Sequence, residues 1–143
     1  MAFNLGAQRT GLTTRLATVT GLHVYRTVPD DIIAPAAIVA PAETFIDYHA
    51  AFAKGLAVAN WRVIVVTGRT MTAEGQNLLD GYLSSGTGQT VSLIDALEGD
   101  KTLAGTVDDI HVSVGNSYGE VKWNETASYF GAELMVAVRV DRQ

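Results

Sequence analysis

The segment from Tyr129 to Val140 alternates apolar and polar residues, and this pattern constrains the fold more than any other in the chain. Successive side chains of a β-strand point to opposite faces of the sheet, so the segment is predicted to be a strand. One face would carry Phe130, Ala132, Leu134, Val136, Val138 and Val140, and the other Glu133, Met135, Ala137, Arg139 and Asp141. A strand with one buried and one hydrated face is typical of an antiparallel sheet.

Two further segments support a mostly antiparallel sheet. Thr106 to Val114 also alternates, and a turn at Gly115-Asn116-Ser117 is predicted to join it in a hairpin to Gly119 to Trp123. Trp61 to Thr67 is apolar on both faces and predicts a central strand.

The first half of the chain gives weaker signals. Leu22 to Val28 is rich in Val, Tyr and Thr and predicts a strand. Ala36 to Ala40 lies between Pro35 and Pro41, which favours an edge strand or one limited at its ends by proline. The aromatic and Ala-rich segment from Thr44 to Asn60 is interpreted as either a hairpin arm or a long loop.

Local signals predict three helices. Apolar residues at helical spacing indicate one over Leu5 to Val19, followed by a stop at Gly21. A second begins at Thr70 or Thr72 and reaches about Ser84, and a short third is capped by Ser92 and ends at Glu98. The order of elements predicts a single α+β domain over residues 1–143, with helices packed on one face of a mostly antiparallel sheet.

The composition suggests that parts of this surface are covered by a partner. Charged residues make up 17% of the chain and hydrophobic residues 48%, whereas soluble domains usually carry about 25% charged residues. The charge-poor stretches are Ala34 to Phe52 and Ser84 to Ser92. Because aromatic residues are enriched in interface cores, the candidate interface residues are Phe45, Tyr48, Phe52, Tyr118 and Trp123. The alternative is that these aromatics fold back over the protein's own core.

No residue set predicts catalysis, a cofactor or a metal. The chain has no cysteine, and His23, His49 and His111 lack metal-ligand spacing. Gly86-Thr87-Gly88 follows a predicted helix and has no lysine, so a helix end and connector is favoured over a phosphate loop. We expect no signal peptide and no membrane span, and the net charge of −5 argues against nucleic-acid binding.

Several residue runs, taken in order, resemble a known family. These are Gly21-Leu22-His23-Val24-Tyr25, Pro29-Asp30, Pro35-Ala36-Ala37-Ile38-Val39, Gly68-Arg69, Leu79-Asp80 with Tyr82-Leu83, the run from Ile94 to Gly105, and Tyr129-Phe130-Gly131-Ala132-Glu133. In this order, roughly from Leu16 to Val140, the chain is similar to proteins of the head-to-tail joining region of long-tailed bacteriophages. Within them it most resembles the tail terminator proteins.

That resemblance implies an α+β subunit of a ring, typically a hexamer, at the head-proximal end of the tail tube in the virion. Such a ring ends tube polymerisation and joins the tail to the head connector or stopper protein, while genomic DNA passes through without specific binding. The resemblance implies no catalytic residue and no cofactor. The alternatives are another neck protein (a stopper or adaptor), a tail-tube-like subunit, or a small enzyme or ligand-binding domain.

Overall fold

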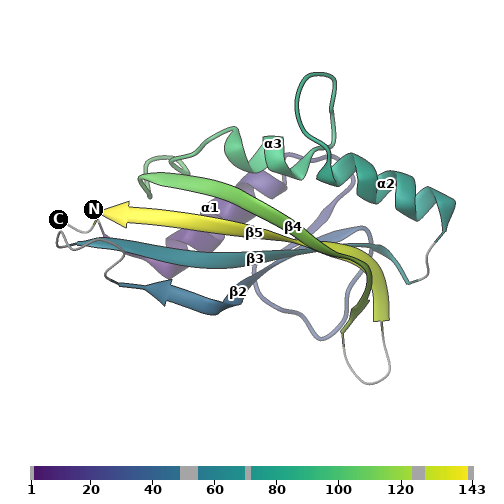
Figure 1. Ribbon diagram of the computed structural model, residues 1–143, viewed down its shortest axis with the longest axis horizontal. Coiled ribbons are helices and arrows are strands. Elements are labelled where there is room, and N and C mark those ends of the chain that lie inside the picture. The colour runs from purple at the N-terminus through teal and green to yellow at the C-terminus, as the bar shows by residue number, and fades with distance from the viewer. Residues whose placement is uncertain (1, 49–54, 70–71, 124–127, 142–143) are drawn as a thin grey trace.

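The computed structural model describes residues 2–48, 55–69, 72–123 and 128–141, and it has the predicted α+β architecture. The elements in chain order are α1 (Leu5–Leu16), β1 (His23–Tyr25), β2 (Ala36–Asp47), β3 (Leu56–Gly68), α2 (Ala73–Leu83), α3 (Leu93–Glu98), β4 (Asp109–Lys122) and β5 (Ser128–Asp141). In the described residues five strands form one sheet in the order β1-β2-β3-β5-β4 (Figure 1). Every neighbouring pair is antiparallel except β1 and β2.

The main core lies between the sheet and the helices, which confirms the predicted packing on one face (Figure 1). Leu12 and Leu16 of α1, Leu79 of α2 and Leu97 of α3 are fully buried against the sheet. The apolar residues predicted on one face of β5 all lie in this core, whereas Glu133, Met135, Ala137 and Arg139 retain exposure.

Trp61 of β3 is at the centre of this core and has no exposed surface. The predicted central strand is confirmed, because β3 is the third of five strands and Val63 to Val66 are all buried. Gln8 of α1 is buried beside Trp61, and its Oε1 accepts a 2.9 Å hydrogen bond from the indole Nε1. The guanidinium of Arg9 lies 4.8 Å from the Trp61 ring centroid.

A smaller core lies on the opposite face of the sheet. The β1–β2 loop, residues 26–35, folds over this face and buries Ile32 against Ile38, Ile64 and Tyr129. The sheet is therefore covered by helices on one face and, over part of the other, by a loop.

Of the two alternatives for Ala36 to Ala40, the edge strand is wrong at its first residues, and a limit set by proline holds only at the start, where β2 begins directly after Pro35 and continues through Pro41. Ala36, Ala37 and Ile38 pair with β1 on one side and with β3 on the other. Proline is tolerated because Pro35 precedes the strand and Pro41 lies beyond the last residue that β1 reaches. Burial within the subunit, rather than a partner, therefore accounts for the low charge of this part of the strand.

The predicted turn at Gly115-Asn116-Ser117 is also wrong. Gly115 and Asn116 pair with Leu134 and Glu133 of β5, so the chain continues as one strand to Lys122 instead of reversing. The ladder shifts register between Asn116 and Gly119, and Ser117 has a φ of 58°. The irregularity is a β-bulge between Asn116 and Gly119, in which Ser117 takes the left-handed conformation that is also common in turns.

The predicted strand from Leu22 to Val28 is only partly correct, because β1 ends at Tyr25 and residues 26–28 belong to the β1–β2 loop. The remaining elements agree with their predictions apart from their ends. The first helix stops at Leu16, although Val19 is still buried. Thr72 caps α2 by accepting a 3.0 Å hydrogen bond from the Gly75 N–H, and Ser92 caps α3 by accepting one of 3.1 Å from the Asp95 N–H. In the segment from Thr44 to Asn60, β2 and β3 pair as Asp47 with Val58, which favours the hairpin arm over the loop, and residues 49–54 lie outside the described residues.

Candidate interaction surfaces

Two of the predicted interface aromatics pack against the protein itself. The Phe45 ring meets the Trp61 ring edge-on at 4.8 Å between centroids. Trp123 is half-buried beside the β1–β2 loop, and its Nε1 donates a 3.2 Å hydrogen bond to the Pro29 carbonyl. The alternative stated for the aromatics, packing over their own core, thus describes these two residues, while Phe52 lies outside the described residues.

Tyr48 and Tyr118 remain candidate interface residues, because 50% and 47% of their surfaces are exposed. Tyr48 contacts the Phe3 ring edge-on at 5.9 Å. Tyr118 packs edge-on against Phe130 at 5.4 Å, and its hydroxyl donates a 2.8 Å hydrogen bond to an Asp80 carboxylate oxygen. This hydrogen bond, with smaller contributions from desolvation and the carboxylate charge, raises the pKa of Tyr118 above its usual value.

Among the described residues, the most exposed large aliphatic side chains lie in the β1–β2 loop, where sequence reasoning predicted no interface. Val28 is 56% exposed and Ile33 is 64% exposed. The loop is held firmly, since the Ile33 N–H donates a 3.1 Å hydrogen bond to the Tyr25 hydroxyl and Asp31 accepts one from the Tyr129 hydroxyl. The sequence did contain a signal for this exposure. In the adjacent pair Ile32-Ile33 one side chain was expected to be buried and the other exposed.

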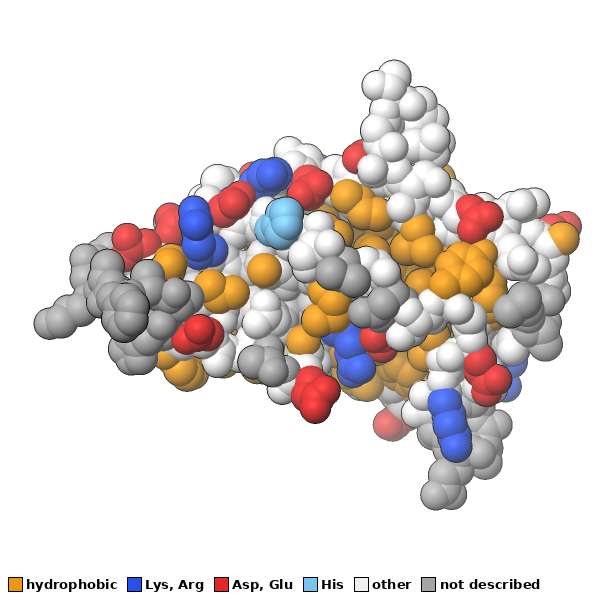
Figure 2. Space-filling model, viewed as in Figure 1, with side chains coloured by type: hydrophobic (Ala, Val, Ile, Leu, Met, Phe, Trp, Pro, Cys, Tyr) orange, Lys and Arg blue, Asp and Glu red, His pale blue; other side chains and the backbone are white. Residues whose placement is uncertain are grey.

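An apolar groove opens beside Tyr118, on the face of the sheet that carries the helices. Its volume is about 410 Å³, and it is lined by Leu83, Ile94, Val112, Ser113, Gly115, Tyr118, Ala132 and Leu134. Figure 2 shows hydrophobic side chains gathered over this part of the molecule, near the bend of β4 and β5. We call this feature the apolar groove.

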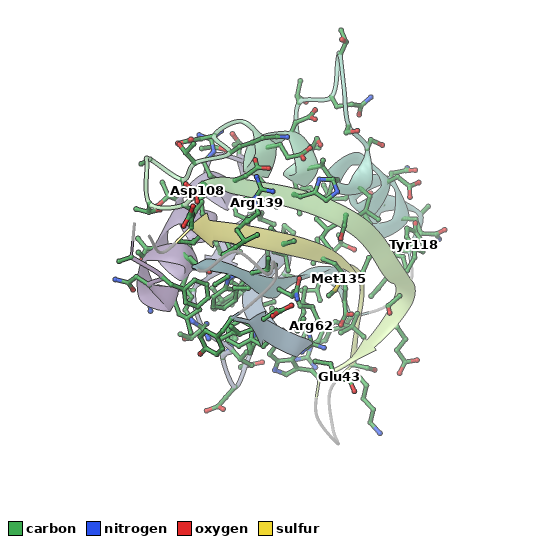
Figure 3. All side chains as sticks on the ribbon, turned by 60° about the vertical axis from the view of Figure 1, so that its left-hand side comes forward. Glu43, Arg62, Asp108, Tyr118, Met135 and Arg139 are labelled. Atoms are coloured by element: carbon green, nitrogen blue, oxygen red, sulfur yellow. The ribbon has the colours of Figure 1, made fainter. Side chains whose placement is uncertain are left out.

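A more polar pocket lies between the β1–β2 loop and the sheet. It has a volume of about 410 Å³ and is lined by Val28, Pro29, Asp30, Arg62, Ile64, Val121, Lys122, Trp123 and Glu133. Arg62 forms a 3.4 Å ion pair with Glu133, and its Nε is buried with no hydrogen-bond acceptor among the described residues. Figure 3 shows Arg62 and Met135 on the adjacent strands β3 and β5, with Arg139 further along β5.

A third depression, with a volume of about 550 Å³, lies along α1. Its floor is formed by small residues of the helix, among them Gly6, Ala7 and Gly11, and its rim includes Arg15, Arg26 and Asp100. Hydrogen bonds from the Ala104 N–H and the Thr102 hydroxyl lower the pKa of Asp100 and tie the turn that follows α3.

The free edges of the sheet are poorly suited to pairing with another strand. β4 is the edge strand on one side, and register shifts after Val112 and after Asn116 interrupt its ladder. On the other side, β2 extends beyond β1 but contains Pro41 and a register shift directly after it. Bulges and proline are common protection against edge-to-edge association, so contacts with other molecules are expected to use side chains.

The residues considered for chemistry are dispersed. His23 and His111 are exposed on β1 and β4, while His49 lies outside the described residues. No group of three or more His, Cys, Asp or Glu residues that could hold a metal occurs in the described part of the chain. Gly86-Thr87-Gly88 belongs to an exposed loop that projects between α2 and α3 (Figure 1), which agrees with a connector. None of the described helices combines the length and hydropathy needed to cross a membrane.

Asp108 and Asp109 are adjacent in sequence but have different partners. Asp108 accepts a hydrogen bond from the Asp141 N–H at the end of β5, and Asp109 is paired in the ladder with Arg139. In Figure 3, Asp108 lies at the opposite end of β4 from Tyr118.

A scan against protein-family models gives no match to this chain, and a search of curated proteins gives no significant match.

Proposed function

We propose that this protein is a structural subunit of a bacteriophage neck, a tail terminator that forms a ring at the head-proximal end of the tail tube in the virion. The ordered set of residue runs between Gly21 and Glu133 carries the proposal. In the structure these runs build the scaffold: β1 beside β2, then α2 and α3, and the first half of β5. They are runs that specify a subunit shape, as expected for a protein whose role is assembly.

The distribution of apolar surface supports a role in an assembly. Exposed apolar side chains occur in the β1–β2 loop, at Tyr48 and around Tyr118, which are separate parts of the molecule. A subunit of a ring uses two different patches, one for each neighbour, and further surface for the tube and the head connector. The interrupted sheet edges direct such contacts to side chains.

The net charge supports passage of DNA without binding. The chain has a net charge of −5. Duplex DNA carries one negative charge per roughly 1.7 Å of its axis, so an acidic ring would repel it during passage.

Electron microscopy and native mass spectrometry of the purified protein test the proposal. A terminator forms short closed rings, alone or on tube ends, and gives tubes of uniform length when mixed with the tube protein of the same phage. Long polymers of this chain alone would instead identify a tube-like subunit. Rings that bind the head connector but leave tube length unregulated would identify a stopper or adaptor.

A second candidate, a small-ligand-binding domain, is favoured by the polar pocket around Arg62. The pocket volume of about 410 Å³ lies in the range of ligand sites, and the buried Arg62 Nε offers an unused donor. A monomer that binds small carboxylates or phosphates in calorimetry, and loses this binding in Arg62→Met, would favour this candidate over the ring subunit.

A further inference from the structure

We propose that the apolar groove of one subunit receives the β1–β2 loop of a second copy of this chain, with Ile33 and Val28 as the inserted side chains. The inference rests on the proposed function and specifies how neighbouring subunits of the ring meet. It joins the two most exposed large aliphatic side chains of the described residues to an apolar groove.

The loop is preorganised for docking. Ile33 and Val28 are 64% and 56% exposed, yet Ile32 between them is buried and the Ile33 N–H is hydrogen-bonded to Tyr25. The loop is held further by Trp123 and by Tyr129. Because the loop is already ordered, binding would cost little conformational entropy, which favours affinity.

The groove offers matching chemistry. Leu83, Ile94 and Val112 line it with half-buried apolar side chains, and Tyr118 forms one wall. The hydrogen bond from Tyr118 to Asp80 and the edge-on contact with Phe130 fix that wall. Filling the groove with two aliphatic side chains would remove apolar surface on both partners from water.

The two features lie on opposite faces of the sheet. The β1–β2 loop packs on the face formed by Ile38, Ile64 and Tyr129, whereas Ala132 and Leu134 in the groove belong to the face covered by helices. A contact between different patches on opposite sides of a subunit is heterologous, so each copy retains one free loop and one free groove. Repetition of such a contact produces a closed ring or a filament.

Charge also favours this pairing over groove-to-groove contacts. The helices beside the groove are acidic and contain no cation: their charged residues are Glu74, Asp80, Asp95 and Glu98. The charges around the loop are balanced: Asp30, Arg62, Lys122 and Glu133 line the pocket beside it, and Arg69 lies 4.0 Å from Asp31. Bringing two acidic groove surfaces together would be repulsive, whereas the loop brings Lys122 and Arg69 towards them.

Charge substitutions on each side, followed by mixing, test the inference. Ile33→Asp alters the loop and Ile94→Asp alters the groove, and Thr20→Asp in the exposed turn after α1 is the matched control. We expect each variant of the pair alone to self-associate at least about tenfold more weakly than the wild type, because a charge enters an apolar contact. Sedimentation velocity measures this, and circular dichroism checks that each variant folds.

The mixture gives the sharper result. The groove of Ile33→Asp and the loop of Ile94→Asp are both intact, so an equimolar mixture is expected to form a one-to-one dimer that does not grow. A mixture that remains monomeric, although both variants are folded, would overturn the inference. Rings of wild-type size from Ile33→Asp would also overturn it and leave the proposed function standing. If Ile33→Asp retained rings but lost binding to tubes, the loop would meet the tube protein instead of a second copy.

Cysteine cross-linking keeps the test independent of folding losses. The chain has no native cysteine, so Ile33→Cys in one protein and Ile94→Cys in another provide the only thiols. A short bismaleimide is expected to link these two proteins, and to link Thr20→Cys with Ile94→Cys at least about tenfold less. Equal cross-linking of both pairs, or none in preparations that form rings, would contradict the contact. A wild-type protein that stays monomeric and does not affect tubes would instead refute the proposed function.

Discussion

Substituting Gly131 with alanine should destabilise the subunit strongly, because no space exists for a side chain at this position, where β5 pairs with β3. Gly131 pairs with Val66, and a Cβ built at Gly131 would lie 1.9 Å from the Val65 carbonyl oxygen and 2.9 Å from the Val66 Cα. These are backbone atoms, so rotating a side chain cannot relieve the overlap. The two central strands would have to separate locally by about 1 Å or more.

The size of the effect follows from the hydrogen bonds that such a separation breaks. An opening of about 1 Å stretches a bond of about 2.9 Å beyond hydrogen-bonding distance. Separation of the strands here would leave at least one N–H and one C=O unpaired in the buried centre of the sheet, and each such group costs about 1–3 kcal/mol. We therefore expect a loss of about 2–6 kcal/mol, a large part of the roughly 5–15 kcal/mol typical of a domain.

Urea unfolding followed by circular dichroism measures this loss. With a slope of about 2 kcal/mol per molar urea, a loss of about 4 kcal/mol lowers the midpoint by about 2 M. Gly115→Ala in β4 is the matched control, since its Cβ would meet Leu134 at an ordinary 3.5 Å, and we expect a change within about 1 kcal/mol. Equal midpoints for Gly131→Ala and Gly115→Ala would refute the argument.

Three further predictions concern side chains. Gln8→Met leaves the buried Trp61 indole N–H without its acceptor, which costs about 1–3 kcal/mol; part of this is offset because the Gln8 Nε2, buried with no acceptor among the described residues, is removed as well. Urea unfolding should show the net loss, and it should shrink in a Trp61→Phe background. Asp100 has a lowered pKa because Ala104 and Thr102 donate to its carboxylate; its contribution to stability is therefore present above pH about 4 and lost as the pH falls through the lower folded value. Acid unfolding should show this loss in the wild type and not in Asp100→Asn. Tyr118 has a raised pKa because it donates to Asp80, so its contribution holds below pH about 10 and is lost as the pH rises through the folded value. Ultraviolet titration of Asp80→Asn should show that tyrosine ionising at a lower pH, and an unchanged titration would contradict the hydrogen bond.

The candidate surfaces could be predicted from sequence only in part. Aromatic content singled out Tyr48 and Tyr118, which are half exposed, together with Phe45, which packs against Trp61. An aromatic residue is equally suited to a core and to an interface, so the sequence could not separate these cases. Ile33 was missed for the converse reason, since its exposure depends on which way the β1–β2 loop folds.

The sequence by itself determined the elements that depend on neighbours along the chain. The alternation in β5, the apolar run in β3 and the caps at Thr72 and Ser92 each specify local structure through periodicity or a nearby hydrogen bond. These features were sufficient to predict the α+β class and the packing of the helices on one face of the sheet.

Only the tertiary structure decided which strands pair and which surfaces remain open. Gly115 to Ser117 has the composition of a turn, but pairing of Gly115 and Asn116 with β5 holds the segment in a strand, and the left-handed conformation of Ser117 is accommodated in a bulge. Ala36 lies inside the sheet because β1 pairs with the start of β2. No local sequence pattern encodes this contact between two segments. The groove and the loop on opposite faces follow from these pairings, so they exist only once the whole sheet has formed.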